Sequence, residues 1–251
     1  MKTAFEFTPS QLSPLTQLYY HFYPGLAILI AYILAGPWIV GMGYPGLTTL
    51  LLAELIILAP IGLGHLVWHS RNSGCGQGFK ALIPFIKKLR MAQYFKWSLL
   101  GILACTLVYL PLYPLGLYMR EQLFSWLPEW YFNPVYGSAD TKLIARVFLA
   151  GIFIDGIIGP VVEEIYFRGY LLPRMAYLGK WAPIINGLLF GLYHFWQPHN
   201  YLAIIAIGMV LSYIVWKKQN VYLGILIHCS LNILGALTAY LAASNGELIM
   251  R

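Results

Sequence analysis

Apolar stretches about as long as a bilayer is thick recur along this chain and leave few folds open to it. A membrane-spanning helix needs about 20 apolar residues, and runs of roughly this length follow one another between about residues 24 and 241. Hydrophobic residues make up 59% of the chain and charged residues only 10%, against about 25% charged in an ordinary soluble domain. The sequence therefore excludes a soluble globular enzyme and predicts an all-α, polytopic membrane helix bundle.

The expected spans can be placed by this length criterion. They cover about residues 24–40, 47–68, 97–118, 181–195, 201–216 and 221–241. Between them, residues 142–178 would form one helix of about 55 Å, which is longer than a bilayer is thick. We expect this segment to break at Gly156, Gly159 and Pro160, because proline suits the first turn of a new helix. These segments are expected to form a polytopic bundle around a buried polar site.

No polar block is long enough to form a separate soluble domain. We therefore expect a single membrane-embedded domain over residues 1–251, with its motifs between residues 142 and 243. The N-terminal region lacks an apolar core that ends at a small-residue cleavage site, so no removable signal peptide is expected. The cysteines Cys75, Cys105 and Cys229 are scattered, and they predict neither a disulfide framework nor a zinc knuckle.

The net charge of +7 has a topological explanation. The lysines and arginines gather in short loops rather than in a basic stripe with exposed aromatic residues, which argues against nucleic acid as a partner. The longest basic loop, about residues 69–96, is expected to face the cytoplasm, with residues 81–89 forming a short helix in the headgroup plane. Lys217 and Lys218 would then fall outside, so either the broken segment does not cross twice or the orientation signal is mixed.

Two adjacent acids and an arginine interrupt the apolar pattern in Glu-Glu-Ile-Tyr-Phe-Arg, residues 163–168. An ionisable residue in a span indicates a functional site by default, because hydrocarbon offers it no water. Residues four apart share a helix face, and Glu before Arg is the favourable order, so we expect a supporting ion pair between Glu164 and Arg168. Glu163 lies about 100° round the helix and needs a partner from another segment.

Candidate partners of Glu163 lie in two later apolar segments. His194 follows Phe190 by four residues, and His228 and Asn232 are also four apart, so each pair shares a helical face. One acid, two histidines and an amide can converge in a bundle core, where helix bundles place their metal and cofactor sites. These four residues form the predicted site.

Three further polar residues lie in apolar segments. Glu54 is inside the second span. Such a residue more often caps or bonds a neighbouring helix, or faces a wet crevice, and membership of the site is the less favoured alternative. Asp155 and Asn186 each precede a site residue by eight positions and are therefore expected near the same helix face, behind the site.

The predicted site supports amide hydrolysis in two alternative ways. Desolvated Glu163 beside His194 is suited to act as general base for a water molecule, while His228 and the Asn232 amide can donate hydrogen bonds to a developing oxyanion. Alternatively, Glu163, His194 and His228 can be three ligands of a zinc ion with an open water position. Against zinc, no histidine pair has the spacing of a single-helix zinc motif. The sequence therefore leaves two alternatives for the cofactor, none or zinc.

The three motifs together resemble those of a known family. Glu-Glu-x-x-x-Arg at 163–168, Phe-x-x-x-His at 190–194 and His-x-x-x-Asn at 228–232 are similar to the motifs of the CPBP intramembrane protease family. This family includes the type II CAAX prenyl endopeptidases and the bacterial Abi-type proteins. The resemblance implies about eight helices and peptide-bond cleavage near the membrane surface. It also implies roles for six residues: water activation by Glu163, partnership by His194, oxyanion stabilisation by His228 and Asn232, and support by Glu164 and Arg168.

We therefore expect a multi-pass intramembrane endopeptidase in a prokaryotic cell membrane. Its partners would be membrane lipids and a peptide or protein substrate, including CAAX-like, lipid-modified or small peptides, and not nucleic acid. Two other functions fit the same residues. One is a non-catalytic membrane protein of the same fold that acts in bacteriocin immunity or binds a partner. The other is a proton-coupled transporter in which Glu163 and the histidines relay protons.

Overall fold

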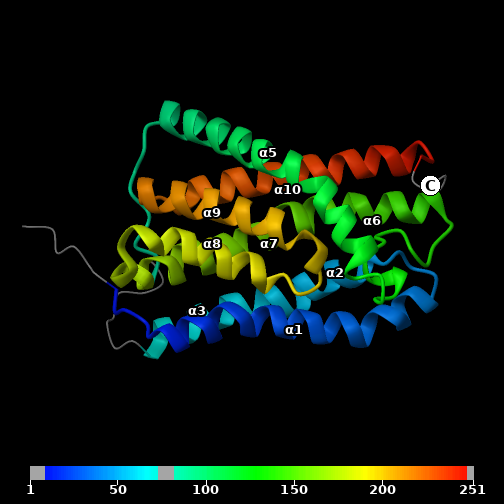
Figure 1. The fold of residues 1–251 in the computed structure, drawn as a ribbon, viewed down its shortest axis with the longest axis horizontal. Coiled ribbons are helices and arrows are strands. Elements are labelled where there is room, and N and C mark those ends of the chain that lie inside the picture. The colour runs from blue at the N-terminus through cyan, green and yellow to red at the C-terminus, as the bar shows by residue number, and fades with distance from the viewer. Residues whose placement is uncertain (1–8, 73–81, 248–251) are drawn as a thin grey trace, which may run out of the picture.

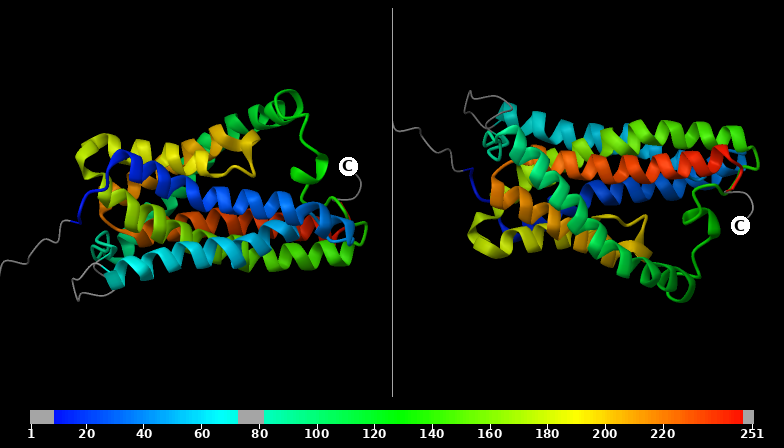
Figure 2. Two further views of the ribbon diagram at one scale, coloured as in Figure 1. Left: turned by 90° about the horizontal axis from the view of Figure 1, so that it is seen from below. Right: turned by 90° about the horizontal axis from the view of Figure 1, so that it is seen from above.

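The computed structural model describes residues 9–72 and 82–247, which fold into a bundle of long helices (Figure 1). Its α-helices and its shorter 3-10 and π-helical segments (η) are, in chain order, α1 (Pro14–Gly41), α2 (Leu47–Ala53), η1 (Glu54–Leu58), α3 (Ala59–Asn72), α5 (Met91–Gln122), η2 (Glu129–Tyr131), α6 (Thr141–Phe153), η3 (Ile154–Ile158), α7 (Gly159–Glu163), η4 (Glu164–Leu171), η5 (Leu172–Trp181), α8 (Ala182–Tyr193), η6 (Pro198–Asn200), α9 (Tyr201–Lys218) and α10 (Val221–Ser244). Figure 2 shows that α5 runs obliquely and leaves the bundle toward its C-terminal end.

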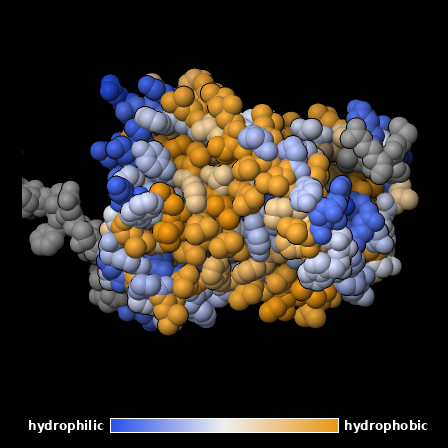
Figure 3. Space-filling view, viewed as in Figure 1, coloured by the Kyte–Doolittle hydropathy of each residue, from blue (hydrophilic) through white to orange (hydrophobic). Residues whose placement is uncertain are grey.

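The surface of the bundle is that of a membrane protein. Six helical segments of the described chain are long and apolar enough to cross a membrane. On the face drawn in Figure 3, hydrophobic residues cover the middle of the molecule and hydrophilic residues gather at both ends. The prediction of an all-α, multi-pass membrane protein is therefore confirmed, whereas the predicted count of about eight spans is not found.

The segment that carries the acidic motif does not break where the sequence suggested. Residues Thr141–Tyr193 count as a single helical segment of 53 residues. At Gly156 and Gly159 the chain makes the π turn η3 and passes directly into α7, with Pro160 in the first turn of that helix. A π turn accommodates an extra residue without ending the helix, so the chain leaves helical geometry only in η5, at Met175 and Gly179.

The short helix α8 explains why the count of spans falls. Its 12 residues make it about 18 Å long, too short for a hydrocarbon core of about 30 Å. It packs along α9, and the connection between the two, residues 194–200, lies against α5 and the loop before α6. There the carbonyl of Phe195 accepts a hydrogen bond of 2.8 Å from the hydroxyl of Tyr131. Such irregular backbone is tolerated in membrane proteins where protein surrounds it.

Lys217 and Lys218 lie at the same end of the bundle as the longest basic loop. The amide of Lys87 donates a hydrogen bond of 2.9 Å to the carbonyl of Gln219, directly after these two lysines. The two lysines and the basic loop therefore no longer predict opposite sides of the membrane, because residues Thr141–Tyr193 count as one candidate span and not as two. The expected headgroup helix is wrong, because residues 83–89 are not helical; residues 73–81 lie outside the described residues.

The packing of α8 on α9 depends on glycines. A Cβ atom on Gly187 would overlap the backbone of Met209, and one on Gly191 would overlap the backbone of Ile205. Backbone atoms cannot move aside by changing rotamer, so only glycine allows the two helices to approach this closely. Small residues four apart are a common device for close helix packing in membranes. This contact holds the end of α8, and with it His194, inside the bundle.

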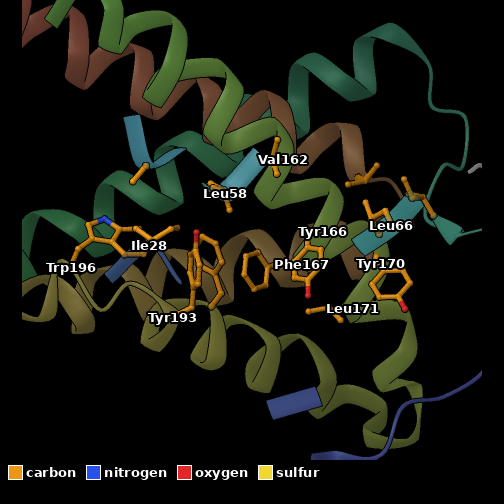
Figure 4. Close-up of a cluster of buried hydrophobic side chains, with 14 of the residues drawn as sticks. Ile28, Leu58, Leu66, Val162, Tyr166, Phe167, Tyr170, Leu171, Tyr193 and Trp196 are labelled. Atoms are coloured by element: carbon orange, nitrogen blue, oxygen red, sulfur yellow. The ribbon is translucent and has the colours of Figure 1, made fainter. Parts of the chain in front are cut away.

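A cluster of buried apolar and aromatic side chains holds the acidic segment between its neighbours. It joins α1, η1 and α3 to α7, η4 and α8 (Figure 4). Phe167 is fully buried, and its ring centroid lies 4.8 Å from that of Tyr193 on α8. Tyr166 donates a hydrogen bond of 2.9 Å to the carbonyl of Tyr20 on α1. The acidic segment is therefore fixed from both sides by large side chains.

We expect Gly187→Ala to destabilise the fold by about 1–3 kcal/mol, the usual effect of overpacking, because the new methyl group meets the backbone of Met209. Gly235→Ala in α10 is the matched control, since a Cβ there meets nothing within 4 Å. Thermal unfolding in detergent measures the difference. Equal midpoints for the two variants would contradict the close packing of α8 on α9.

Candidate active site

The π turn η3 prepares the position of Asn232. In this turn the amide of Gly159 bonds to the carbonyl of Ile154, five residues earlier. The next carbonyl, that of Asp155, would pair with the amide of Pro160 in the same pattern, but proline has no N–H. The side-chain amide of Asn232 on α10 donates to this carbonyl at 2.9 Å. The carbonyl oxygen of Asp155, which has no backbone partner in this turn, thus fixes the side-chain amide of Asn232.

Glu164 connects two positively charged or chargeable side chains. Its Oε1 lies 3.0 Å from an Nη of Arg168 in the same helical segment and 3.0 Å from Nδ1 of His228 on α10. Glu164 and Arg168 are fully buried. Gly224 makes room for this carboxylate, because a Cβ on it would overlap the second oxygen of Glu164. The predicted pair of Glu164 and Arg168 is present, and it also reaches the histidine.

The guanidinium of Arg168 is held on its other sides by α8 and α9. Its Nε donates to Ser212 at 3.2 Å, and its plane lies 3.7 Å from the ring centroid of Phe190. Ser212 in turn donates to the side-chain oxygen of Asn186 at 2.8 Å. These hydrogen bonds hold Arg168 and, through it, Oε1 of Glu164 in place, while Oε2 of Glu164 is buried without a hydrogen-bond partner among the described residues.

Glu163 faces three polar side chains, of which His228 also contacts Glu164. The hydroxyl of Tyr193 donates to its Oε1 at 2.8 Å. Nε2 of His194 lies 3.8 Å from Oε1, and Nε2 of His228 lies 3.8 Å from Oε2. Both distances are too long for direct hydrogen bonds. The carboxylate therefore has one fixed hydrogen bond and two histidine nitrogens within reach of a bridging molecule.

Both histidines turn the same ring nitrogen toward Glu163. Nδ1 of His194 lies 2.9 Å from the carbonyl of Phe190, and Nδ1 of His228 lies 3.0 Å from the carboxylate of Glu164. Carbonyl and carboxylate oxygens only accept hydrogen bonds, so Nδ1 carries a hydrogen in each ring. The neutral form of either histidine then offers a lone pair at Nε2.

These side chains enclose one cavity of about 160 Å³, large enough for several water molecules. Glu163, His194 and His228 are 6–8% exposed. The cavity is lined by Glu54, Asp155, Gly159, Pro160, Glu163, Phe190, His194, Trp196, Gln197, Ile204, Ile207, His228, Leu231 and Asn232. The structure thus brings all four residues of the predicted site to one cavity.

Glu54, Asp155 and Asn186 can be compared with their expected places, and Tyr193 is an addition that the sequence did not predict. Glu54 lines the cavity rather than only bonding a neighbouring helix, and Asp155 lines it too. Asn186 lies behind the site, linked to Arg168 through Ser212. Tyr193 was not foreseen, because a tyrosine in an apolar run looks like any other packing residue. Its position directly before His194 is the one sequence signal that could have drawn attention to it.

The zinc alternative can be tested against the same geometry. The donor chemistry suits zinc, since two histidines with their Nδ1 hydrogens engaged and one carboxylate are typical ligands. Over residues 9–72 and 82–247, however, no three His, Cys, Asp or Glu side chains are gathered closely enough to hold a metal ion. The residues as arranged do not form a metal centre, and we derive no step through one.

Comparison with known proteins gives one match. Residues 145–234 match the family model described as type II CAAX prenyl endopeptidase Rce1-like. No curated protein and no solved structure matches the chain. The matched segment runs from α6 into α10 and contains Glu163, Glu164, Arg168, His194, His228 and Asn232. Over residues 145–234 the chain is therefore similar to the type II CAAX prenyl endopeptidases that this model describes.

Proposed function

We propose that this protein is an intramembrane endopeptidase in which Glu163 activates a water molecule to hydrolyse a peptide bond. The observation that carries the proposal is the arrangement of the Glu163 carboxylate and two histidine Nε2 atoms, each 3.8 Å away, around one buried cavity. The match of residues 145–234 to a family model of endopeptidases supports the same reaction.

The spacing around Glu163 suits a bridging water. A water between Glu163 and His194 can donate one hydrogen to the carboxylate and the other to the lone pair on Nε2. As the water oxygen bonds to the scissile carbonyl carbon, Glu163 takes the first proton. When the C–N bond breaks, Glu163 returns that proton to the departing nitrogen, which leaves as an amine. His194 orients the water without taking its proton.

The charges of the cluster determine what His228 does. Glu163 and Glu164 are acids and Arg168 is a cation, so the buried group is electrically neutral when His228 is protonated. A neutral group is favoured, because an uncompensated buried charge is strongly unfavourable. A protonated His228 donates Nδ1–H to Glu164 at 3.0 Å and has Nε2–H free toward the cavity. That hydrogen can stabilise the oxyanion of the tetrahedral intermediate.

Asn232 can add a second donor to the oxyanion. One N–H of its amide is held by the carbonyl of Asp155 at 2.9 Å, and the other remains for the cavity, since an amide has two. Because the first bond fixes the plane of the amide, the second hydrogen is oriented before the substrate arrives. Pre-oriented donors of this kind are usually a large part of catalysis.

The substrate we propose is a peptide or protein segment within or beside the bilayer, including prenylated CAAX-type chains. The cavity wall combines the polar residues with Phe190, Trp196, Ile204, Ile207 and Leu231. A peptide bond meets the polar residues, while apolar side chains or a lipid group meet the others. The name of the matched family supports this substrate class.

Glu163→Gln should lower cleavage by at least about 10²-fold, the lower range for loss of a general base. The assay uses full-length protein in lipid vesicles and an internally quenched, farnesylated peptide with a CAAX end, alongside its unprenylated twin. The exposed Glu121→Gln is the matched control. Cleavage retained by Glu163→Gln would contradict the proposal. Treatment with a chelator should leave the wild-type rate unchanged, whereas a chelator-sensitive rate would favour the zinc alternative.

Glu164→Ala should chiefly reduce folded yield and thermal stability. It leaves Arg168 fully buried without its carboxylate, and breaking a buried ion pair on one side typically costs about 3–5 kcal/mol. Thermal unfolding and gel filtration in detergent measure the effect, with Glu164→Gln as the milder comparison. Normal stability combined with a selective loss of cleavage would show that Glu164 does not hold the structure.

Tyr193→Phe should lower kcat by about tenfold while the protein stays folded. The ring keeps its packing, but Glu163 loses the hydrogen bond of 2.8 Å that fixes its carboxylate, and a bond to a charged group is worth about 1.5–3 kcal/mol. Steady-state kinetics on the same peptide, together with the unfolding midpoint, separate the two effects. A kcat equal to that of the wild type would remove Tyr193 from the site.

A further inference from the structure

Arg146 is an exposed cation within a candidate membrane span, residues Thr141–Tyr193. It lies near the start of α6, and the exposed Lys142 precedes it by four residues on the same helix face. Within residues 9–72 and 82–247, no hydrogen bond or ion pair joins either side chain to the rest of the protein. An ionisable residue in a span indicates a functional site by default, so a partner for these two charges has to be sought.

Neither a nearby acid nor the topology of the chain explains the two cations. The carboxylate of Asp140 accepts hydrogen bonds from the backbone amides of Lys142 and Leu143, at 2.9 and 3.2 Å. Membrane proteins gather basic residues at one end, but here the basic loop and the lysines of α9 lie where α10 begins, whereas α6 begins where α10 ends (Figure 1). The charges are therefore left for a molecule outside the chain to compensate.

An apolar cavity of about 240 Å³ runs from Arg146 toward the middle of the bundle. It lies between the second helical segment and the segment that begins with α6. Ala150 and Ile154 follow Arg146 in steps of four along one wall, which makes this wall about 12 Å long. Leu52 and Leu55 form the other wall and are 41% and 37% exposed. The cavity is thus open at the surface, apolar along its length and positively charged at one end.

A second cavity, of about 290 Å³, lies on the other side of Arg146, between α6 and α10. Its lining includes Arg146 and Lys142 together with Thr141, Tyr240 and Ser244, whose side chains all carry N–H or O–H groups. These residues belong to the first turns of α6 and the last turns of α10, at the level where the polar headgroup layer of a bilayer lies. Arg146 therefore stands between a polar cavity at headgroup level and a deeper apolar one.

We propose that this surface binds an anionic phospholipid, with the phosphate on Arg146 and Lys142 and one acyl chain in the apolar cavity. A guanidinium group matches a phosphate with two parallel N–H donors. A headgroup of net negative charge is favoured over a zwitterionic one, because two unpaired cations face it. The acyl chain reaches Leu55 in η1 and Ile154 in η3, the π turns that also border the active cavity. This inference does not depend on the proposed function.

Photocrosslinking in lipid nanodiscs tests the site. The full chain is placed in phosphatidylcholine with a small share of phosphatidylglycerol that carries a photoactivatable group in its acyl chain, and mass spectrometry maps the labelled peptides. We expect labelling of residues 48–55 and 146–154. Arg146→Gln should reduce this labelling about fivefold, the usual effect of one interfacial cation on binding to anionic lipid. Labelling of the exposed Leu103 and Leu107 on α5 should stay unchanged.

Two further variants separate charge from shape. Lys96→Gln removes an exposed cation near the start of α5, and it should label as the wild type does. Ala150→Phe keeps both cations but fills the apolar cavity, so it should reduce labelling of the cavity. Thermal unfolding in detergent confirms that each variant is folded.

Equal labelling of the cavity in the wild type and Arg146→Gln would show only a non-specific lipid layer and would overturn the site. Equal labelling by phosphatidylglycerol and phosphatidylcholine probes would do the same. Crosslinks from the cavity to a second copy of the chain, in place of lipid, would also overturn it. Cleavage by Glu163→Gln tests the proposed function separately, since none of these measurements uses a peptide substrate.

Discussion

The contact of Glu164 with both Arg168 and His228 is the interaction on which the rest of this site depends. It lies where hydrocarbon offers no water, so the charge of Arg168 has to be compensated inside the protein. One carboxylate oxygen, 3.0 Å from each partner, neutralises the arginine, joins η4 to α10 and places a hydrogen on Nδ1 of His228. The chemistry proposed for Glu163 is possible because Glu164 compensates the charge of Arg168 and accepts a hydrogen bond from Nδ1 of His228.

Irregular helical turns carry three acids in or beside the active site. In the described chain, Glu54 begins η1, Asp155 lies in η3 and Glu164 begins η4, and all three are π-helical segments. A π turn rotates the following residues relative to a regular helix and leaves backbone groups without their usual partners, which explains why such turns are frequent at functional sites. At η3 the freed carbonyl of Asp155 holds Asn232. The π turn that changes the backbone at η3 therefore also positions Asn232 in the site.

Sequence spacing predicted the parts of the site that depend on one helix. The rule that residues four apart share a face predicted the pair of Glu164 and Arg168, and it required Glu163 to find partners elsewhere. The meeting of Glu163, His194, His228 and Asn232 at one cavity follows from burial, because polar residues in apolar helices are placed together or not at all. These expectations needed no knowledge of how the helices are arranged.

Other features depend on contacts between distant segments and could not be predicted in the same way. Gly156, Gly159 and Pro160 predicted a break, but whether such residues end a helix or form a π turn is decided by neighbours such as Asn232. Glycine spacing in α8 did not show that α8 would pack along α9 as a helix too short to span the bilayer, so the predicted count of about eight spans is not found among the described residues. Tyr193 and Glu54 join the site because of where α8 and η1 lie, which residue spacing does not record.

Nitrogen-15 NMR of histidine-labelled protein in lipid nanodiscs tests the central interaction most directly, with His228→Gln used to assign the signal. The account predicts that His228 is protonated on both ring nitrogens at neutral pH, while His194 is neutral with its hydrogen on Nδ1. A neutral His228 with its hydrogen on Nε2 would contradict the account, because Glu164 would then not be its partner.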